Sequence, residues 1–463
     1  MLRNITVFSM HQDFIIISAI TAYDLGASAT LLQKIYENEA KIQRPILLSD
    51  TDKQIVITAD NWTQYIGNRN AYSGFVNFFE KQIHSSGALS TLEDFVFSSD
   101  ANSNGVNMTV RLVSGALHPF IQVGYGLEFG NEKLIAAGLA QTAVHKPLSD
   151  TIFQFKNPTK SSVNVNGNQT NCRQPYRGPS LLELLRQVYD SSILTPVMPY
   201  DPNAFISERR KAALSDGRSQ EILRICSQYY VDEESGDEEF EAKAEECVWL
   251  STLLLFSTGR EGRKPRLDFF LMHLVTSSFF LFHYFRTLRN PVHKANILRA
   301  LVPEIFLYTL TRGRPVIKPD LLMSYTSTPK PPTPIDSLLK PDKSCLGDPL
   351  KDEDYFPWPA LIGAVLYAPD AHVLKTMRTL ILAAKKYGDT PPGGAIGAYQ
   401  ISASNEDKNL ETHPGTSQMD GTIFVRAAGL MLDYMGWVTH GQPARDDWDR
   451  SALGWDDAWA NED

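Results

Sequence analysis

The sequence predicts a mainly α-helical protein built as a single large domain. Apolar residues recur at helical spacing along most of the chain, whereas the alternation of apolar and polar residues that marks a β-strand is scarce. Segments rich in proline, glycine, serine and asparagine separate the helical stretches, and no internal repeat is visible. With 463 residues, of which 43% are hydrophobic, the chain can bury a large core. We therefore expect one helical domain with long loops.

The N-terminal part predicts short helices in succession. Residues 9–40 predict two helices broken at Gly26, and Ser28 can cap the second of them. His11 lies on the first. Residues 70–97 predict a further helical stretch, which is rich in phenylalanine and is interrupted near Gly87.

A helical hairpin is expected over residues 116–145. Pro119 suits the first position of a helix, where its missing N–H costs nothing, so His118 stands at the helix entrance. Asn131 can cap a second helix that ends near His145, because Pro147 cannot continue it. The hairpin therefore has His118 and His145 at its outer ends and Glu128 near its turn. The glycines of GYGLEFG do not form a dinucleotide-binding fingerprint, because their spacing is one residue too long and they lie within a helical pattern.

The remaining chain alternates between helices and three long loops, over residues 153–179, 312–359 and 393–421. The prolines of 312–359 predict extended chain without helices. We expect the acidic tail to dock on the body through three tryptophans. The expected helices of this part cover residues 181–189, 209–230, 247–256, 267–285, 290–310, 361–366, 370–386 and 423–437.

Charge and composition restrict the partners. The net charge of −9 argues against nucleic acid or an anionic membrane surface as the main partner. Residues 269–282 are too short and too interrupted to span a bilayer, and His11, Gln12 and Asp13 occupy the place where the apolar centre of a signal peptide would begin. The four cysteines show no metal-ligand or redox spacing, which is typical of free thiols in a reducing compartment. We expect a cytoplasmic protein without a membrane partner, and the oligomeric state is left open.

Two further stretches carry side chains suited to chemistry. His273 lies in a strongly apolar stretch, where an unpartnered imidazole would be costly to bury. His372 and Lys375 are three residues apart on one predicted helix and therefore share a face. Lys375 is either a surface lysine with a buried stem or a buried amine with a lowered pKa. A buried neutral lysine can act as a base or react with carbon dioxide to give a carbamate, which is an oxygen ligand of the carboxylate type. Histidines with one anionic oxygen suit non-haem iron, although zinc and manganese remain alternatives.

Several stretches together resemble one known family. The sequences ALHPFIQVGYGLEFG with AAGLAQTAVH, RLDFFLMHLVTSSFFL and DAHVLKTMRTL resemble the questin oxidase-like family of fungal polyketide-tailoring enzymes. His11 followed by AYDLGAS, and GWDDAW near the C-terminus, are also similar to that family. The resemblance implies secondary-metabolite biosynthesis, in which dioxygen is used to open the quinone ring of an anthraquinone-type polyketide. Some members are described as NADPH-dependent Baeyer–Villiger oxidases. At least one branch is understood as a non-haem iron dioxygenase whose metal is held by four histidines and a carboxylated lysine.

The resemblance also implies roles for individual residues. It implies Fe(II) as the cofactor and Lys375, as a carbamate, as a catalytic residue and metal ligand. From the residues alone, Glu128 is a second candidate catalytic residue that would orient a ligand histidine by accepting a hydrogen bond, and the equally weighted alternative is that it caps a helix or pairs at the surface. Gln122 stands where many members have a second histidine, so no ligand is expected there. The expected histidine ligands are His118, His273, His372 and either His11 or His145, and the expected pocket walls are Tyr125, Phe129, Phe269 and Phe279.

Two alternatives remain beside the iron dioxygenase. The first is an NADPH-dependent Baeyer–Villiger oxidase on the same fold, which would need a reductant. The second is a helical polyketide-binding protein without chemistry, whose histidines would be dispersed and individually satisfied. A zinc hydrolase is disfavoured because no HExxH motif is present.

Overall fold

Helices account for nearly all of the regular structure. The computed structural model describes residues 12–41, 54–147, 149–157, 178–195, 197–332, 344–400, 410–445 and 448–460, with side chains from residue 15 onward. Within these ranges, β-type pairing is limited to two isolated bridges, Asp268 with Asp449 and Tyr399 with Glu411. The prediction of a mainly α-helical fold is confirmed.

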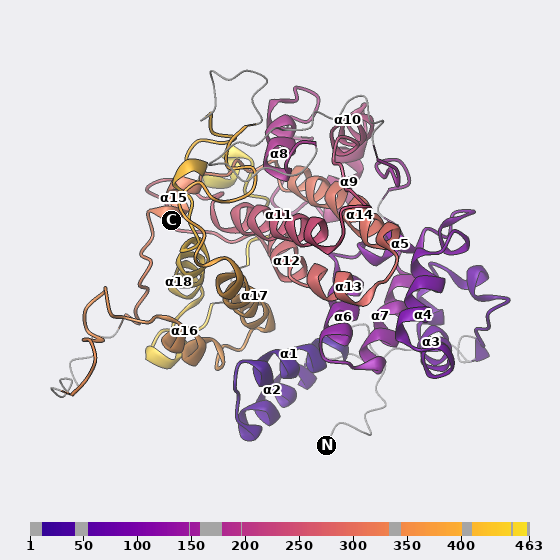
Figure 1. Ribbon diagram of the computed structural model, residues 1–463, viewed down its shortest axis with the longest axis horizontal. Helices are drawn as coiled ribbons and strands as arrows, with labels where there is room; N and C mark the ends of the chain where they lie inside the picture. The colour runs from indigo at the N-terminus through magenta and orange to yellow at the C-terminus, as the bar shows by residue number, and fades with distance from the viewer. Residues whose placement is uncertain are drawn as a thin grey trace.

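The helices follow one another in chain order as Figure 1 labels them. The first half contains α1 (Gln12–Asp24), α2 (Ala29–Lys41), α3 (Tyr72–Ser86), α4 (Ala88–Leu92), α5 (Met108–Leu112), α6 (His118–Glu128), α7 (Glu132–Val144), α8 (Leu181–Asp190), α9 (Ile206–Leu214) and α10 (Arg218–Cys226). The second half contains α11 (Asp237–Phe256), α12 (Phe269–Ser278), α13 (Leu281–Thr287), α14 (Pro291–Thr311), α15 (Pro319–Met323), α16 (Trp358–Val365), α17 (Ala371–Tyr387) and α18 (Ile423–Met435).

The central helices α11, α12 and α14 are flanked on both sides. Helices α3, α4 and α7 lie on one side and α16, α17 and α18 on the other, while the pair α1 and α2 lies below them in the view of Figure 1. One hydrophobic core cluster joins these groups, from Ile17 in α1 to Trp455 near the C-terminus. Helix α17 contacts α1, α12, α16 and α18, so it links the N-terminal pair to the centre.

The predicted helical hairpin is present as α6 and α7. Helix α6 begins at His118 with proline in its first turn, and the Asn131 side chain caps α7 by accepting from the backbone N–H groups of Lys133 and Leu134, both at 3.1 Å. The two helices approach closely because their contact face carries glycine. A Cβ atom added at Gly126 would lie 2.5 Å from the side chain of Ile135. Any larger residue there would push the helices apart.

A strained turn leads into α6. Gly115, Ala116 and Leu117 have φ angles of 61°, 56° and 62°, and the last two are left-handed residues that carry a Cβ atom. The Tyr308 hydroxyl supports the turn by accepting the N–H of Ala116 at 3.0 Å. This turn sets the direction in which His118 enters the helix.

The N-terminal helices agree with the prediction. Helices α1 and α2 are separated at Gly26, whose φ is 92°, and the Ser28 hydroxyl accepts the N–H of Leu31 at 3.3 Å. His11 lies outside the described residues.

Two predicted helices are each divided in the structure. The stretch 209–230 forms α9 and α10, separated where Gly217 adopts a φ of 82°. The stretch 267–285 forms α12 and α13. The two helices meet near two serines. The hydroxyls of Ser277 and Ser278 donate to the backbone carbonyls of Leu274 and Val275 at 3.0 and 2.9 Å. Such side-chain bonds to the backbone compete with the backbone hydrogen bonds that would continue the helix.

The predicted loops are partly corrected. Residues 158–177 and 401–409 lie outside the described part, so most of the first loop and the centre of the third are not described. The second loop contains α15 and the start of α16, where no helix was expected. Pro319 occupies the first turn of α15, a position in which proline favours a helix start instead of preventing it.

The C-terminal tail docks on the body as predicted. Trp448, Trp455 and Trp459 are all buried. The backbone of Asp449 pairs with the strand-like residues before α12, because its N–H bonds Leu267 O and its carbonyl accepts from Phe269 N, both at 2.8 Å. The start of α12 is therefore held by residues almost two hundred positions later in the chain.

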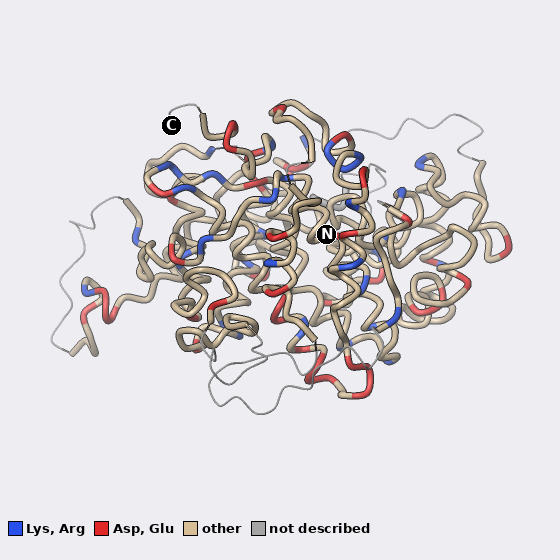
Figure 2. The backbone as a smooth tube through the Cα atoms, turned by 90° about the horizontal axis from the view of Figure 1, so that it is seen from above, with Lys and Arg blue, Asp and Glu red and all other residues tan. Residues whose placement is uncertain are grey.

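Charge and thiols add to the description of the fold. Acidic and basic residues are interspersed along the described backbone in Figure 2. No helix in the described part has the length and apolar character needed to cross a membrane. Cys226, Cys247 and Cys345 are free thiols, and Cys172 lies outside the described ranges.

Candidate functional site

Three of the predicted histidines converge from three different helices. His118 comes from the start of α6, His273 from α12 and His372 from the first turn of α17. The Nε2 atoms of His118 and His273 are 3.0 Å apart, and the ring centroids of His273 and His372 are 5.5 Å apart. We call these residues, with Lys375, the histidine–lysine cluster.

Oxygen acceptors fix the tautomers of two of these rings. His273 Nδ1 lies 2.8 Å from the carbonyl oxygen of Phe269, one helical turn earlier. His372 Nδ1 lies 2.8 Å from Oδ1 of Asp370. Carbonyl and carboxylate oxygens only accept, so each Nδ1 carries the hydrogen and, in the neutral ring, each Nε2 keeps a lone pair. This is the arrangement found behind metal-bound histidines.

Burial favours the neutral form of two histidines of the cluster. His273 is 2% exposed, and its pKa lies well below the usual value, first because of burial and then because His118, His372 and Lys375 would repel a second positive charge. Burial, followed by the charge of Lys375, also lowers the pKa of His372. Neutral imidazole is the form that binds a metal ion.

Lys375 is a buried amine and not a surface lysine. Its side chain is 5% exposed, on the helix that also carries His372. Burial lowers its pKa to about 8, a shift that the negative charges of Asp370 and Glu39 partly offset. A large fraction of the amine is therefore neutral near pH 8, which is the form that reacts as a base or with carbon dioxide.

The cluster fits part of a metal site. Two nitrogens that each lie about 2.1 Å from one metal ion, at angles of roughly 90–110°, are separated by about 3.0–3.4 Å. The 3.0 Å between Nε2 of His118 and Nε2 of His273 matches that separation, and without a metal the same distance is a hydrogen bond. Among the described side chains, no group of three or more histidine, cysteine, aspartate or glutamate residues is placed to hold a metal ion. The predicted ligand His11 lies outside them.

His145 does not join the other three histidines. It lies at the C-terminal end of α7, where Nδ1 donates to the carbonyl of Gln141 at 2.7 Å and its own carbonyl accepts from Arg111. The imidazole packs against Gly115, where an added Cβ atom would lie 2.3 Å from the ring. In the structure His145 thus supports the turn before α6.

Glu128 pairs with an arginine. Its carboxylate accepts two hydrogen bonds from the guanidinium of Arg378, at 3.1 and 2.5 Å, and lies 3.4 Å from Nε2 of His283. Arg378 also bonds Asp24 at 2.7 Å, and its pKa is raised because these partners outweigh burial. Glu128 therefore joins α6 to α17, next to the cluster, without a contact to its three histidines.

The four aromatic residues predicted to line the pocket lie in three different places. Phe269 lies at the cluster, with ring centroids 4.9 Å from His273 and 5.3 Å from His372. Tyr125 and Phe129 stack on each other beneath Arg378. The pKa of Tyr125 is raised to about 12, chiefly by burial. Phe279 packs on Phe282 instead.

Asp370, Trp448 and Arg450 hold the cluster from behind, a role that no sequence prediction assigned to them. Asp370 caps α17, fixes the His372 ring and accepts a hydrogen bond from the indole N–H of Trp448, and its pKa is lowered to about 2 because bonds to His372 and Trp448 outweigh burial. The Arg450 guanidinium lies 4.2 Å above the ring of Phe269. The position of Asp370, two residues before a histidine at a helix start, was a usable local signal. Trp448 and Arg450 offered none.

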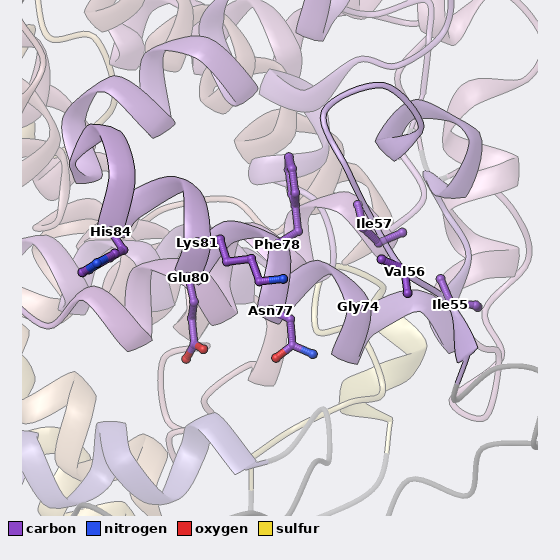
Figure 3. Close-up of a pocket in the computed structure, with 9 residues that line it drawn as sticks. All are labelled: Ile55, Val56, Ile57, Gly74, Asn77, Phe78, Glu80, Lys81 and His84. Atoms are coloured by element: carbon purple, nitrogen blue, oxygen red, sulfur yellow. The ribbon is translucent and has the colours of Figure 1, made fainter.

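Two cavities of similar size lie in the described part. One of about 380 Å³ is formed by α3 and the segment Ile55–Ile57, and Figure 3 shows the residues that line it. The other, of about 370 Å³, lies between α2 and the turn that joins α16 to α17, and Glu39 lines it. The four predicted pocket residues line neither cavity.

Fold and site together define an all-helical protein with a buried histidine–lysine cluster. The chain belongs to the questin oxidase-like family, whose model matches residues 11–380. This confirms the family predicted from the sequence.

Curated fungal proteins are similar to this chain in sequence. A questin oxidase of Aspergillus fumigatus is 28% identical over 262 residues, which cover 56% of each chain. A Baeyer-Villiger oxidase of Pestalotiopsis fici is 27% identical over 269 residues, covering 57% of this chain and 55% of the relative. A questin oxidase of Aspergillus terreus is 25% identical over 311 residues, covering 66% and 65%. The aligned part thus spans between about half and two thirds of these relatives.

Proposed function

We propose that the protein is an oxidoreductase that uses dioxygen to cleave the quinone ring of an anthraquinone-type polyketide, as a non-haem iron dioxygenase. The names of its relatives, questin oxidase and Baeyer-Villiger oxidase, support an oxidase of this substrate class. One observation carries the iron proposal: Nε2 of His118 and Nε2 of His273 lie 3.0 Å apart, beside His372 and the buried Lys375.

The cluster residues would hold the iron through complementary donors. His118, His273 and His372 would offer imidazole nitrogens, and Lys375, as a carbamate, would offer an anionic oxygen. Iron bound there would supply the activation of dioxygen. His11 stays a predicted fourth histidine, whereas His145 is occupied with the turn before α6.

The protein would orient the ligand side chains and exclude water from the site. The carbonyl of Phe269 and the carboxylate of Asp370 hold two imidazoles by their Nδ1–H groups, so their Nε2 atoms need little reorganisation to bind a metal. Burial favours the neutral form of His273 and lowers the pKa of the Lys375 amine to about 8. The burial of both side chains also excludes bulk water from the reacting centre. The free thiols of the described part support a reducing compartment, for which we propose the cytoplasm.

A second candidate is an NADPH-dependent Baeyer–Villiger oxidase, which the name of the Pestalotiopsis relative favours. The two reactions differ in their electron balance. A dioxygenase places both oxygen atoms in the product, and the substrate supplies all the electrons. A Baeyer–Villiger oxidase inserts one oxygen atom and reduces the other to water with two electrons from NADPH.

The deciding experiment combines metal analysis with dioxygen consumption. Protein purified without chelator and reconstituted anaerobically with Fe(II) is mixed with an anthraquinone hydroquinone, with and without NADPH. We expect stoichiometric iron, ring opening without NADPH, and two labelled oxygen atoms in the product from isotopically labelled dioxygen. Strict dependence on NADPH with one labelled atom would establish the second candidate.

Lys375→Ala tests the carbamate ligand. We expect this variant to lose both iron retention and turnover. Lys386→Ala is the matched control, because Lys386 lies on the same helix but pairs with Glu241 at the surface, at 2.6 Å. A Lys375→Ala variant that stays iron-replete and active would refute the role of Lys375.

A further inference from the structure

The groove between α2 and the turn that joins α16 to α17 borders the histidine–lysine cluster. It has a volume of about 370 Å³, within the range of small-molecule sites. The Asn38 side chain spans it by donating to the carbonyl of Pro369 at 3.3 Å, which fixes α2 relative to the start of α17. The groove is thus a formed feature of the described fold.

Helix α17 connects the groove to the cluster. Ala371 and Leu374 line the groove, and Ala371 and Lys375 are four residues apart, so they share a helix face. From the opposite wall, Glu39 of α2 is close enough for its charge to act on both Lys375 and Asp370. Glu39 therefore lines the groove and lies within electrostatic range of the buried lysine.

The lining has the character of a site for a flat hydroxylated ring. Glu39 is a carboxyl group that is only 5% exposed among mainly apolar walls, while Lys34 and Lys41 stand exposed at the rim. Apolar walls bind the faces of an aromatic ring system, and a buried carboxyl can hold a ring hydroxyl by hydrogen bonding. The apolar part of the lining includes Leu31, Ile35, Leu366, Ala368, Ala371 and Leu374.

We propose that the aromatic substrate enters through this groove and that Glu39 holds one of its ring hydroxyls beside Lys375. The proposal rests on the proposed function for the identity of the reaction, but the groove and its ligand chemistry can be tested without iron. Glu39 is then a residue that selects hydroxylated rings.

The first test fills the groove. Ala368→Trp places an indole at a half-buried position of the lining. Asn77→Trp is the matched control, because Asn77 is an exposed lining residue of the other cavity, of about 380 Å³ (Figure 3). Binding of chrysazin, a dihydroxyanthraquinone, is measured on metal-free protein by equilibrium dialysis. We expect Ala368→Trp to weaken binding by at least about tenfold and Asn77→Trp to leave it unchanged. Equal binding by both variants would overturn the proposal.

The second test addresses Glu39. We expect the unsubstituted protein to prefer chrysazin to anthraquinone without hydroxyls, and Glu39→Gln to reduce this preference roughly tenfold while anthraquinone binds as before. If Glu39 had only a structural role, Glu39→Gln would weaken the binding of both ligands to the same extent. That result would show that Glu39 does not contact the ligand.

The outcomes separate the groove from the iron chemistry. If iron is absent and turnover fails while Ala368→Trp still weakens chrysazin binding, the proposed function falls and the groove stands. If iron-dependent ring opening proceeds and Ala368→Trp leaves chrysazin binding unchanged, the function stands and the groove proposal falls.

Discussion

Asp370 Oδ1 lies 2.8 Å from Nδ1 of His372 and 2.8 Å from the backbone nitrogen of the same residue. One carboxylate oxygen thus caps α17 and orients the imidazole in its first turn. The two roles can be separated, because asparagine caps a helix about as well as aspartate but carries no charge.

Asp370→Asn should therefore weaken metal binding while it keeps the helix cap. We expect the free energy of unfolding to fall by about 1.5–3 kcal/mol, because the amide nitrogen that replaces Oδ2 cannot accept the indole N–H of Trp448. We expect iron affinity to fall about 10–100-fold. The measurements are thermal unfolding of the metal-free protein and a competitive iron titration. Asn290→Ala is the control, because Asn290 caps α14 by accepting from Val292 N at 2.9 Å and its loss should lower stability alone. Unchanged iron affinity in Asp370→Asn would show that Asp370 acts only as a cap.

Trp448→Phe should loosen the support of Asp370. The variant keeps an aromatic ring but loses the N–H that bonds Asp370. Trp437→Phe is closely matched, since the buried Trp437 indole donates to Asp433 at 2.7 Å, away from the cluster. We expect both to lose about 1.5–3 kcal/mol of stability and only Trp448→Phe to weaken iron binding. If both variants bind iron like the unsubstituted protein, the contact between the tail and Asp370 does not affect metal binding.

The pH dependence of carbamate formation should report the lowered pKa of Lys375. Only the neutral amine reacts with carbon dioxide, and burial brings the pKa to about 8 from the ordinary 10.5. At a fixed partial pressure of carbon dioxide, the carbamate signal in carbon-13 NMR should therefore grow as the pH rises through about 8. Lys375→Ala should lack this signal. Growth centred near the ordinary lysine pKa would mean that the amine is not buried in solution.

Glu128→Gln separates a catalytic from a structural glutamate. Because both carboxylate oxygens bond Arg378, we expect a loss of about 1.5–3 kcal/mol of stability. We expect iron content and turnover per folded molecule to persist, as measured below the unfolding transition. Loss of turnover in a folded, iron-replete variant would instead restore the catalytic role predicted for Glu128.

Local signals were sufficient for the helical hairpin. Pro119, Asn131 and Pro147 mark its start, its second cap and its end, and each acts through the backbone of its near neighbours. Likewise, a spacing of three residues was enough to place His372 and Lys375 on one face. The short helix α15 was missed because the many prolines of 312–359 predict a loop, although Pro319 in a first turn is compatible with a helix.

The convergence of the cluster could not be derived from local patterns. His118 and His273 are 155 positions apart in the sequence, and only the resemblance to a family brought them together in advance. Glu39, whose charge acts on Lys375 from α2, was missed for the same reason: in the sequence it is one glutamate of an ordinary amphipathic helix. Contacts between distant helices depend on how the whole core packs, which periodicity does not encode.

The docking of the tail also imposes an order on biosynthesis. Asp449 pairs with the start of α12, which carries His273, and Trp448 donates to Asp370, which orients His372. Both supporting residues lie outside residues 11–380, the part that the family model matches. A growing chain on the ribosome contains the three cluster histidines, the last of which is His372, well before it contains these supports. The cluster therefore acquires its full support only after Trp448 and Asp449 have been synthesised.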